Sequence, residues 1–446
     1  MLYAIGVIAF AIGLLASIAL HEIGHMVPAK KFGVKVTQYM VGFGPTLWSK
    51  HKGDTEYGIK AIPLGGYIRM IGMVPPRKDG SRSRWPTRMA TLVEEFRATS
   101  RTEVTADVED RQFYKLPPGK KIIVMLGGPT MNLLIFFVIT VLLYGVVGIK
   151  GPTTTIGSVS DCVVSAAAQT EAACPSQASN GYRPAPANGV LQPGDKITAI
   201  NGTKISKWSD AVPVIEASAN KTLTLSVIRK GQPLQLSITP VLNTKYANAA
   251  GTQTKQAGFI GVSPTESYQQ LSAGQLRGVV WQQMTLGVDA LGKFPSKIGN
   301  LFGTVFEGKP RDQQGAVGVV GLGRIGGQIA DSKNIVAKDK ISSLLSLLAS
   351  VNLLLFFFNL LPLLPLDGGH VAGALVEAVR RGRARLKHRK QTTVGPDGTA
   401  VAGSDRPKIY VDVAQMVPVM YVVASILIVF SVLVMYADIV KPISIN

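Results

Sequence analysis

Charged residues are scarce in this chain of 446 residues. Asp, Glu, Lys and Arg make up 17% of the chain, whereas a typical soluble domain contains about 25%. Hydrophobic residues make up 46%, and the mean hydropathy is +0.25. The apolar residues are gathered into a few long runs instead of being spread evenly. This composition argues against a purely soluble protein and predicts membrane spans.

Cysteine is nearly absent, since Cys162 and Cys174 are the only two in the chain. Two thiols exclude a scaffold built on disulfides and a cysteine-rich zinc module. If their segment faces an oxidising compartment, a bridge between them would close a short loop and stabilise the fold by about 3 kcal/mol. Two free thiols are the alternative, and we favour the bridge.

Acidic residues are also few, because 27 Asp and Glu stand against 47 Lys and Arg, giving a formal net charge of +20. We expect no nucleic-acid partner, since the basic blocks flank apolar runs and lack interleaved aromatic residues on which bases could stack. Residues 28–121 hold 18 of the Lys and Arg, residues 371–416 hold 9, and the longer segment 150–340 holds 19. The positive-inside rule then places the first two segments in the cytoplasm and the third outside it.

Four apolar runs are long enough to cross a membrane as helices. The first, residues 2–20, has no charged residue. It differs from a signal peptide because no Lys or Arg precedes it and no small-residue cleavage site follows it. The other runs cover about residues 122–149, 341–366 and 416–436. Four spans put both termini on one side, which the charge distribution predicts to be extracytoplasmic.

Strand-like runs occur between the first two spans. Residues 34–43 and 57–70 mix β-branched and aromatic residues, with turn signals at Gly53-Asp54 and at residues 63–66. This pattern predicts short strands joined by turns. Residues 75–119 are polar and contain Pro pairs, so we expect most of them to form a flexible cytoplasmic loop.

A second β-rich segment follows the second span. Residues 153–241 contain runs such as 223–229 and 234–239, which predict strands. Residues 189–202 fit L-x-x-G-D-x-I-x-x-I-N-G, a pattern that resembles the core of bacterial PDZ domains. Residues 272–329 are amphipathic and rich in glycine, which predicts short helices lying on the membrane surface.

The first apolar run ends in His21-Glu22-Ile23-Gly24-His25, an H-E-x-x-H motif. On a helix, histidines four residues apart share a face and can bind one metal ion, while Glu22 beside them can accept a proton from a water molecule. Polar side chains at the end of an apolar run are costly without partners. The motif therefore predicts a metal site rather than two solvent-facing histidines.

A catalytic zinc ion usually has three protein ligands, so a third is needed. The third span ends in Leu366-Asp367-Gly-Gly-His370 on the same predicted side as His21 and His25, whereas Asp438 lies at the opposite side. We predict Asp367 as the third ligand. The alternatives are that Asp367 caps the next helix, or that His370 is the ligand. For His370 we favour a role that supports the ligands.

Several motifs together resemble the site-2 protease family of intramembrane zinc metalloproteases, in particular its bacterial regulator-of-sigma-E protease branch. Besides the H-E-x-x-H motif, residues 127–132 are similar to the family's second-span motif, and residues 32–70 resemble its membrane-associated β-hairpin. Residues 359–368 resemble its N-x-x-P-x-P-x-L-D-G signature, with the second proline displaced by one position to Pro365. One PDZ-like unit is evident where that branch often carries two.

The resemblance implies a polytopic α-helical membrane protein with four transmembrane helices, a membrane-associated β-hairpin and an extracytoplasmic PDZ-like α+β domain. It implies a bacterial inner-membrane protease with one Zn²⁺ per chain, cleaving single-span membrane proteins such as anti-sigma factors. A helical substrate must unwind, and its freed backbone groups then need partners. Asn132 and Asn359 are our candidates, although either could instead serve helix packing.

The predicted organisation follows from these assignments. Its segments are the first span (1–27), the cytoplasmic hairpin and loop (28–121), the second span (122–149), the PDZ-like domain (150–265), an amphipathic segment (266–340), the third span with the LDG motif (341–370), a cytoplasmic basic loop (371–415), and the fourth span with a short tail (416–446).

Two other classes of function remain open from the sequence. A non-catalytic membrane scaffold or chaperone would use the PDZ-like domain to recruit peptides and would hold a structural metal. A metal transporter would bind the ion as cargo. Glu22 favours the protease, because neither alternative needs a proton acceptor beside the ligands.

Overall fold

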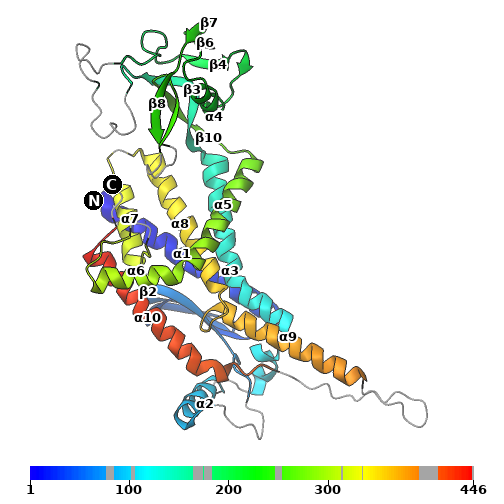
Figure 1. The fold of residues 1–446 in the computed structure, drawn as a ribbon. Coiled ribbons are helices and arrows are strands. Elements are labelled where there is room, and N and C mark those ends of the chain that lie inside the picture. The colour runs from blue at the N-terminus through cyan, green and yellow to red at the C-terminus, as the bar shows by residue number, and fades with distance from the viewer. Residues whose placement is uncertain are drawn as a thin grey trace. The chain divides into compact units, whose positions relative to one another are not determined.

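The computed structural model describes residues 1–76, 85–101, 106–163, 174, 183–246, 254–312, 315–333, 335–390 and 410–443. The chain divides into two compact units (Figure 1). Met1–Leu143 and Gly274–Asn446 form the first unit, which is largely helical, and Tyr144–Ala273 form the second, which is rich in strands.

The first unit contains one long hairpin and most of the helices. Its elements are α1 (Leu2–Lys31), β1 (Val36–Lys52), β2 (Thr55–Met70), α2 (Thr87–Arg101), η1 (Ala106–Arg111), η2 (Phe113–Lys115), α3 (Pro118–Thr140), α5 (Ala273–Gly292, which begins at the boundary), α6 (Phe294–Phe306), α7 (Val319–Asp331), α8 (Ala337–Asn359), α9 (Asp367–Lys390), η5 (Val413–Met416) and α10 (Val417–Val440).

Four helices in the described part of the chain are long and apolar enough to cross a membrane. They cover Leu2–Lys31, Pro118–Val147, Ala337–Asn359 and Val413–Val440. The prediction of four apolar helices is therefore confirmed. The first continues past the apolar run to Lys31, so the whole H-E-x-x-H motif lies within a regular helix.

The first and second of these helices touch through their backbones. A Cβ atom on Gly24 of α1 would lie 2.3 Å from the Gly127 carbonyl oxygen of α3. Conversely, a Cβ on Gly127 would lie 2.0 Å from the Gly24 carbonyl oxygen. Real side chains cannot approach so closely, and only glycine allows this crossing. The contact fixes α1 against α3 beside the two histidines.

The hairpin is longer and more folded than the short strands predicted from the sequence. In β1, residues 36–41 pair with residues 66–70 on one side and with residues 56–59 on the other. The far half of β1, residues 46–52, pairs with residues 55–60. Two bent strands therefore make a four-stranded mixed sheet, with residues 66–70 at one edge.

Glycines explain why these strands bend. Gly42, Gly44 and Gly65 have positive φ angles, which residues with a Cβ rarely adopt. They let each strand turn back on itself while pairing continues. The predicted turn at Gly53-Asp54 joins β1 to β2, as expected.

Part of the expected cytoplasmic loop is helical. Residues 87–101 form α2, and Val93 packs on Ala414 and Val417 at the start of the fourth span. The buried Arg97 guanidinium donates to Asp412 at 2.9 and 3.1 Å. The prediction of loop was wrong here because these stabilising partners lie more than 300 residues further along the chain. Residues 371–390 of the predicted basic loop are likewise helical, in α9.

Three helices occupy the predicted amphipathic segment. α6 and α7 have 13 residues each, whereas α5 has 20. α5 packs on the spans, since a Cβ on Gly287 would lie 2.4 Å from the Phe357 ring of α8. α7 contacts α1, where a Cβ on Gly6 would lie 2.5 Å from the Gly326 carbonyl oxygen. α5 and α7 therefore approach the spans at glycine positions.

The second unit is a sheet with one covering helix. Its elements are η3 (Val141–Val147, which continues α3 and crosses the boundary), β3 (Ile149–Val159), β4 (Lys196–Ile200), β5 (Thr203–Lys204), α4 (Trp208–Ala217), β6 (Leu223–Arg229), β7 (Gln232–Ile238), β8 (Val241–Tyr246), β9 (Thr254–Phe259) and β10 (Val262–Gln269). The strand order is β10-β3-β4-β6-β7, with β5 paired to β4, and β8 and β9 form a separate hairpin. The predicted strands at 223–229 and 234–239 are confirmed as β6 and β7.

Apolar side chains from the sheet and from α4 form the core of this unit. Ile156, Ile197, Leu225 and Ile215 are among its buried members. The buried Asp195 carboxylate accepts from the Arg229 guanidinium at 2.7 and 2.8 Å, which ties the loop before β4 to β6. This ion pair holds the pKa of Asp195 below its usual value, mainly through the hydrogen bond from Arg229.

Candidate active site

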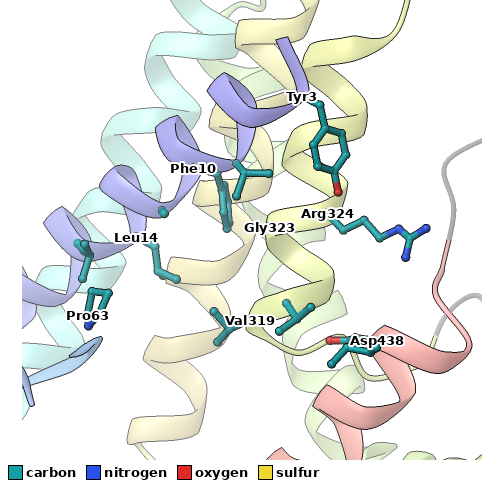
Figure 2. A pocket seen from close by; sticks show the side chains of 13 residues that line it. Tyr3, Phe10, Leu14, Pro63, Val319, Gly323, Arg324 and Asp438 are labelled. Carbon is teal, nitrogen blue, oxygen red and sulfur yellow. The ribbon is translucent and has the colours of Figure 1, made fainter. Parts of the chain in front are cut away.

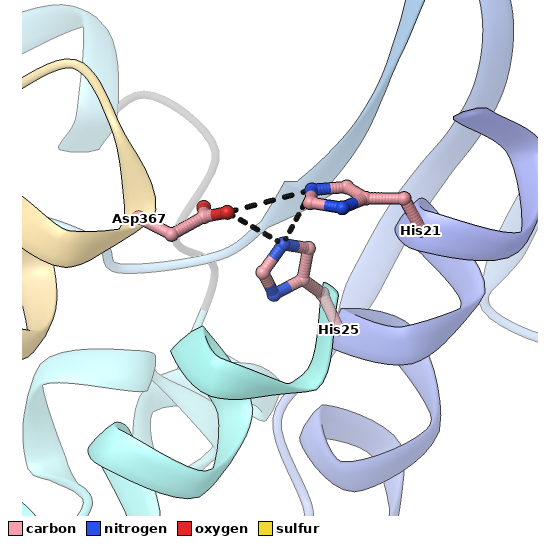
Figure 3. Close-up of side chains that lie close together, drawn as sticks. All are labelled: His21, His25 and Asp367. Atoms are coloured by element: carbon pink, nitrogen blue, oxygen red, sulfur yellow. Dashed lines mark hydrogen bonds and ion pairs between the residues drawn. The ribbon is translucent and has the colours of Figure 1, made fainter. Parts of the chain in front are cut away.

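Two residues of α1 and one of α9 meet at a single point (Figure 3). The Nε2 atoms of His21 and His25 are 3.2 Å apart. Each lies 3.4 Å from Oδ2 of Asp367, the first residue of α9. The potential ligand atoms of these three residues all lie within 4.8 Å of one another. His21 and His25, which lie four residues apart on α1, thus meet Asp367 of the LDG segment, as the sequence indicated.

A carbonyl of α3 orients one of the imidazoles. Nδ1 of His25 lies 2.8 Å from the Val124 carbonyl oxygen, in a buried contact. A carbonyl can only accept, so Nδ1 carries the proton and donates it. Nε2 of His25 is then left with its lone pair toward His21 and Asp367, which is the form a metal ion requires.

The three side chains fit a zinc ion. Two imidazole nitrogens and one carboxylate oxygen form a donor set that catalytic zinc sites use, with a fourth position left for water or substrate. Within the described residues, Asp367 Oδ2 and His21 Nδ1 are buried without a hydrogen-bond partner. His370, the alternative ligand, is not part of this group of ligand atoms in the described residues. Burial lowers the pKa of His370, which favours its neutral form.

Asp367 is positioned by the tight turn between α8 and α9. A Cβ on Gly368 would lie 2.3 Å from the Leu361 carbonyl oxygen, and one on Gly369 would lie 2.6 Å from the Leu364 nitrogen. Both positions therefore require glycine. Burial by itself would raise the pKa of the Asp367 carboxyl, but the imidazoles of His21 and His25 outweigh it and hold this pKa below its usual value. The carboxylate is thus ionised and suited to bind a cation.

Glu22 lies between the three ligand candidates and the hairpin. A Cβ on Gly66 of β2 would lie 3.2 Å from Cγ of Glu22, so the two residues are in contact. The Tyr39 hydroxyl of β1 donates to the Ala19 carbonyl of α1 at 2.9 Å and holds the hairpin there. Glu22 interacts electrostatically with His21, His25 and Asp367. A carboxylate therefore stands beside the potential metal site, next to an edge strand.

The other predicted residues are not among the three described residues whose ligand atoms converge. Asn132 of α3 is buried, and both polar atoms of its amide lack partners among the described residues. Asn359 is half-buried at the last residue of α8. Cys162 and Cys174 are joined by a disulfide in the second unit.

Three buried polar contacts were missed by the sequence analysis. Asn352 Nδ2 donates to Ser17 Oγ at 2.9 Å, joining α8 to α1. Two ion pairs are also buried: they join Lys121 to Glu377 at 2.8 Å and Arg311 to Asp438 at 2.9 Å. A polar residue inside or at the end of an apolar run was the available signal. Its partner could not be identified without the fold.

A cavity of about 520 Å³ lies apart from the three ligand candidates (Figure 2). Side chains of α1 and α7 line most of it, including Phe10, Leu14 and Val319. Asp438 reaches it from α10, but this carboxylate already accepts from Arg311 and from the Gly318 and Gly321 N–H groups. The lining is therefore mostly apolar, and we assign the chemistry to the histidine site.

The structure combines helices that can span a membrane with two histidines, an aspartate and an adjacent glutamate. This combination defines a membrane-embedded metallohydrolase. The chain belongs to peptidase family M50, whose model matches residues 9–399. This is the family of the site-2 proteases, which are zinc metalloendopeptidases, and the chain is accordingly a multi-pass membrane protein and a zinc-dependent peptidase.

Similar proteins match along almost the whole chain. Zinc metalloprotease Rip1 of Mycobacterium tuberculosis is 31% identical over 457 residues, covering 99% of this chain and 99% of that protein. Zinc metalloprotease Rip1 of Mycolicibacterium smegmatis is 30% identical and covers 100% of both. Regulator of sigma-W protease RasP of Bacillus subtilis is 26% identical, covering 84% of this chain and 90% of that protein.

Gly128 provides a direct test of the site's geometry. A Cβ on this residue of α3 would lie 2.2 Å from His25 Nε2 and 2.6 Å from His21 Nε2. Gly128→Ala should therefore displace the imidazoles and weaken zinc binding by at least about tenfold, the lower range for disturbing the support of a ligand. Competition with a chelator measures the affinity. Gly119→Ala on the same helix is the control, since nothing lies within 4 Å of its Cβ. Equal affinities in the two variants would contradict the proposed site.

Proposed function

We propose that this protein is an intramembrane zinc protease that hydrolyses peptide bonds within or next to the membrane-spanning segments of single-span proteins, with anti-sigma factors as the substrate class. The convergence of His21, His25 and Asp367 beside Glu22 is the observation that carries the proposal. The name of the relative RasP, a regulator of sigma-W protease, supports the choice of substrates.

His21, His25 and Asp367 would hold the zinc ion, and Glu22 would act as the general base. Zinc bound there would supply a Lewis acid that polarises a water molecule and the scissile carbonyl. Glu22 takes the proton from the attacking water as that water adds to the carbonyl carbon. The same carboxyl group then returns the proton to the leaving amide nitrogen. The Val124 carbonyl keeps His25 in the tautomer that this arrangement needs.

The hairpin is suited to hold an unwound substrate. Residues 66–70 form an edge of the four-stranded sheet, and Gly66 contacts Glu22. An extended peptide added at this edge would gain backbone hydrogen bonds that replace those of its helix. Asn132 lies one turn beyond Gly128 on α3, and its unpartnered amide could bind a further backbone group. We assign Asn359 the same role from its place at the end of α8.

We place the site at the cytoplasmic face of the bacterial inner membrane and both termini on the extracytoplasmic side. The support is the density of Lys and Arg in residues 28–121 and 371–416. The second unit is then an extracytoplasmic PDZ-like domain, where the Cys162–Cys174 disulfide would be stable. On this proposed topology, the unit would select substrates without taking part in the chemistry.

A scaffold with a structural metal is the alternative from another class. Structural zinc sites usually have four protein ligands. The described residues bring together three. A fourth ligand supplied by the protein would favour the scaffold, whereas Glu22 beside a three-residue set favours hydrolysis.

Metal analysis of single variants tests the ligand set. The purified protein should contain about one zinc ion per chain, and His21→Ala, His25→Ala and Asp367→Ala should each lose most of it because two ligands hold the ion weakly. Co-expression with single-span membrane proteins, followed by mapping of the fragments, identifies the cleaved bond. Full zinc retention in Asp367→Ala would transfer the third ligand to His370.

A further inference from the structure

A buried carboxylate of α9 lies at the meeting point of three segments of the chain. Oε2 of Glu377 accepts from Lys121 Nζ of α3 at 2.8 Å. The side chains of Glu377 and Lys121 are only 2% and 8% exposed. Arg381 of α9 pairs with Glu377 Oε1 at 2.7 Å, and the Val411 N–H donates to Oε2 at 3.3 Å. One carboxylate therefore joins α3, α9 and the segment before the fourth span.

An aromatic ring completes this cluster. Lys121 Nζ lies 5.5 Å from the centre of the Tyr410 ring, and the Arg381 guanidinium carbon lies 5.3 Å from it. Tyr114 packs edge-on against the same ring at 5.1 Å. Two cations thus have both a carboxylate and a ring face as partners, which makes burial of these charges tolerable.

α3 connects this cluster to the proposed zinc site. Lys121 precedes Val124 by one helical turn, so both lie on the same side of α3. Val124 orients His25 through its carbonyl, whereas Lys121 holds α9 through Glu377. α3 is therefore the common support for α1, which carries the two histidines, and for α9, which begins with Asp367.

We infer that Glu377 is a positioning residue for Asp367, because it locks α9 to α3 in the register that brings the Asp367 carboxylate to the histidines. Glu377 lies ten residues after Asp367, about 15 Å along a helix. The partners of Glu377 are Lys121, Arg381 and the Val411 N–H, and it is not one of the three converging residues. The inference rests on the ligand set proposed above, and it goes beyond that set by assigning a task to a charged cluster outside the site.

Glu377→Gln tests this role, since it retains the shape of the side chain and removes its charge. Lys121 would be left buried without its counter-ion, and the contact of α9 with α3 should loosen. The dissociation constant for zinc should rise about 10–100-fold, as for other residues that orient ligands. The visible absorption spectrum of the Co²⁺-substituted protein should also change, because it reports on the ligand geometry.

Asp438→Asn is the matched control. Asp438 and Arg311 form an ion pair of similar burial, with 2% and 6% exposure, that joins α10 to the segment before α7. This variant should lose stability to a similar extent while its zinc affinity and cobalt spectrum stay as in the wild type. If Glu377→Gln does not accumulate, Glu377→Asp serves the same test, because it keeps the charge but withdraws it by one methylene.

A double variant shows whether Glu377 acts through Asp367. In an Asp367→Ala background, Glu377→Gln should not weaken zinc binding further. Wild-type affinity in Glu377→Gln, or the same loss in both backgrounds, would overturn the positioning role alone. Wild-type affinity in Asp367→Ala itself would overturn the proposed ligand set, and this inference with it.

Discussion

Glu22→Gln should leave the zinc content unchanged and reduce cleavage of a membrane-spanning substrate by more than the roughly 10²–10⁴-fold typical of losing a general base. Glutamine has the size and polarity of glutamate but cannot accept the proton of the attacking water. The loss should exceed that range because the nucleophile is no longer generated efficiently. Co-expression with a substrate and quantification of its fragments measure the rate, and metal analysis of the same preparation measures the zinc.

Glu56→Gln is a suitable control for this variant. Glu56 lies in β2 of the same hairpin, accepts from the Gln38 amide at 2.9 Å and is not one of the three converging residues. Its loss should leave cleavage close to the wild-type rate. Near-normal turnover in Glu22→Gln would remove Glu22 from the mechanism, whereas loss of zinc in that variant would make Glu22 a ligand.

Removal of the second unit should permit cleavage of substrates that still carry bulky extracytoplasmic domains. The sheet register pairs Ile149 with Gln269, and the Leu271 N–H donates to the Tyr144 carbonyl at 2.9 Å. The chain therefore enters and leaves this unit at one place, and residues 149–269 can be replaced by a short linker. If the unit excludes large substrates, cleavage of such a substrate should rise from undetectable to readily measured. Fragment analysis of shortened and intact substrates gives the comparison.

The same deletion combined with Glu22→Gln shows whether any new cleavage comes from this site. The deleted protein must first be shown to insert into the membrane and to bind zinc. Failure to cleave substrates that are already shortened would then identify the unit as a recruiter of peptides, and the exclusion hypothesis would be wrong.

Local patterns made the convergence of His21, His25 and Asp367 predictable. The spacing of His21 and His25 needs only a helix, and α1 is a regular helix through both. Asp367 required one further step, namely the side of the membrane at which each span ends. By contrast, the need for glycine at position 128 arises from the crossing of α1 and α3, which no local pattern contains.

The elements that were predicted poorly depend on distant partners. α2 has a polar sequence, and its stability comes from packing of Val93 and from the Arg97–Asp412 pair. Likewise, Lys121 looked like one more basic residue at the start of a span, although Glu377 neutralises it. Secondary-structure propensity and hydropathy describe a segment by itself, so they cannot predict contacts between residues that are far apart in the sequence.

The backbone contact between Gly24 and Gly127 also limits how water, which hydrolysis consumes, reaches the site. Hydrolysis consumes one water molecule per bond, yet no water can pass where the backbones of α1 and α3 touch. The side chain of His25, on that flank, is 6% exposed, whereas those of His21 and Asp367 are 14% and 19% exposed. His21 and Asp367 therefore lie on the more open flank of the group, and we expect water to enter there. A substrate strand held at the hairpin edge, next to Glu22, would then lie close to the water that it consumes.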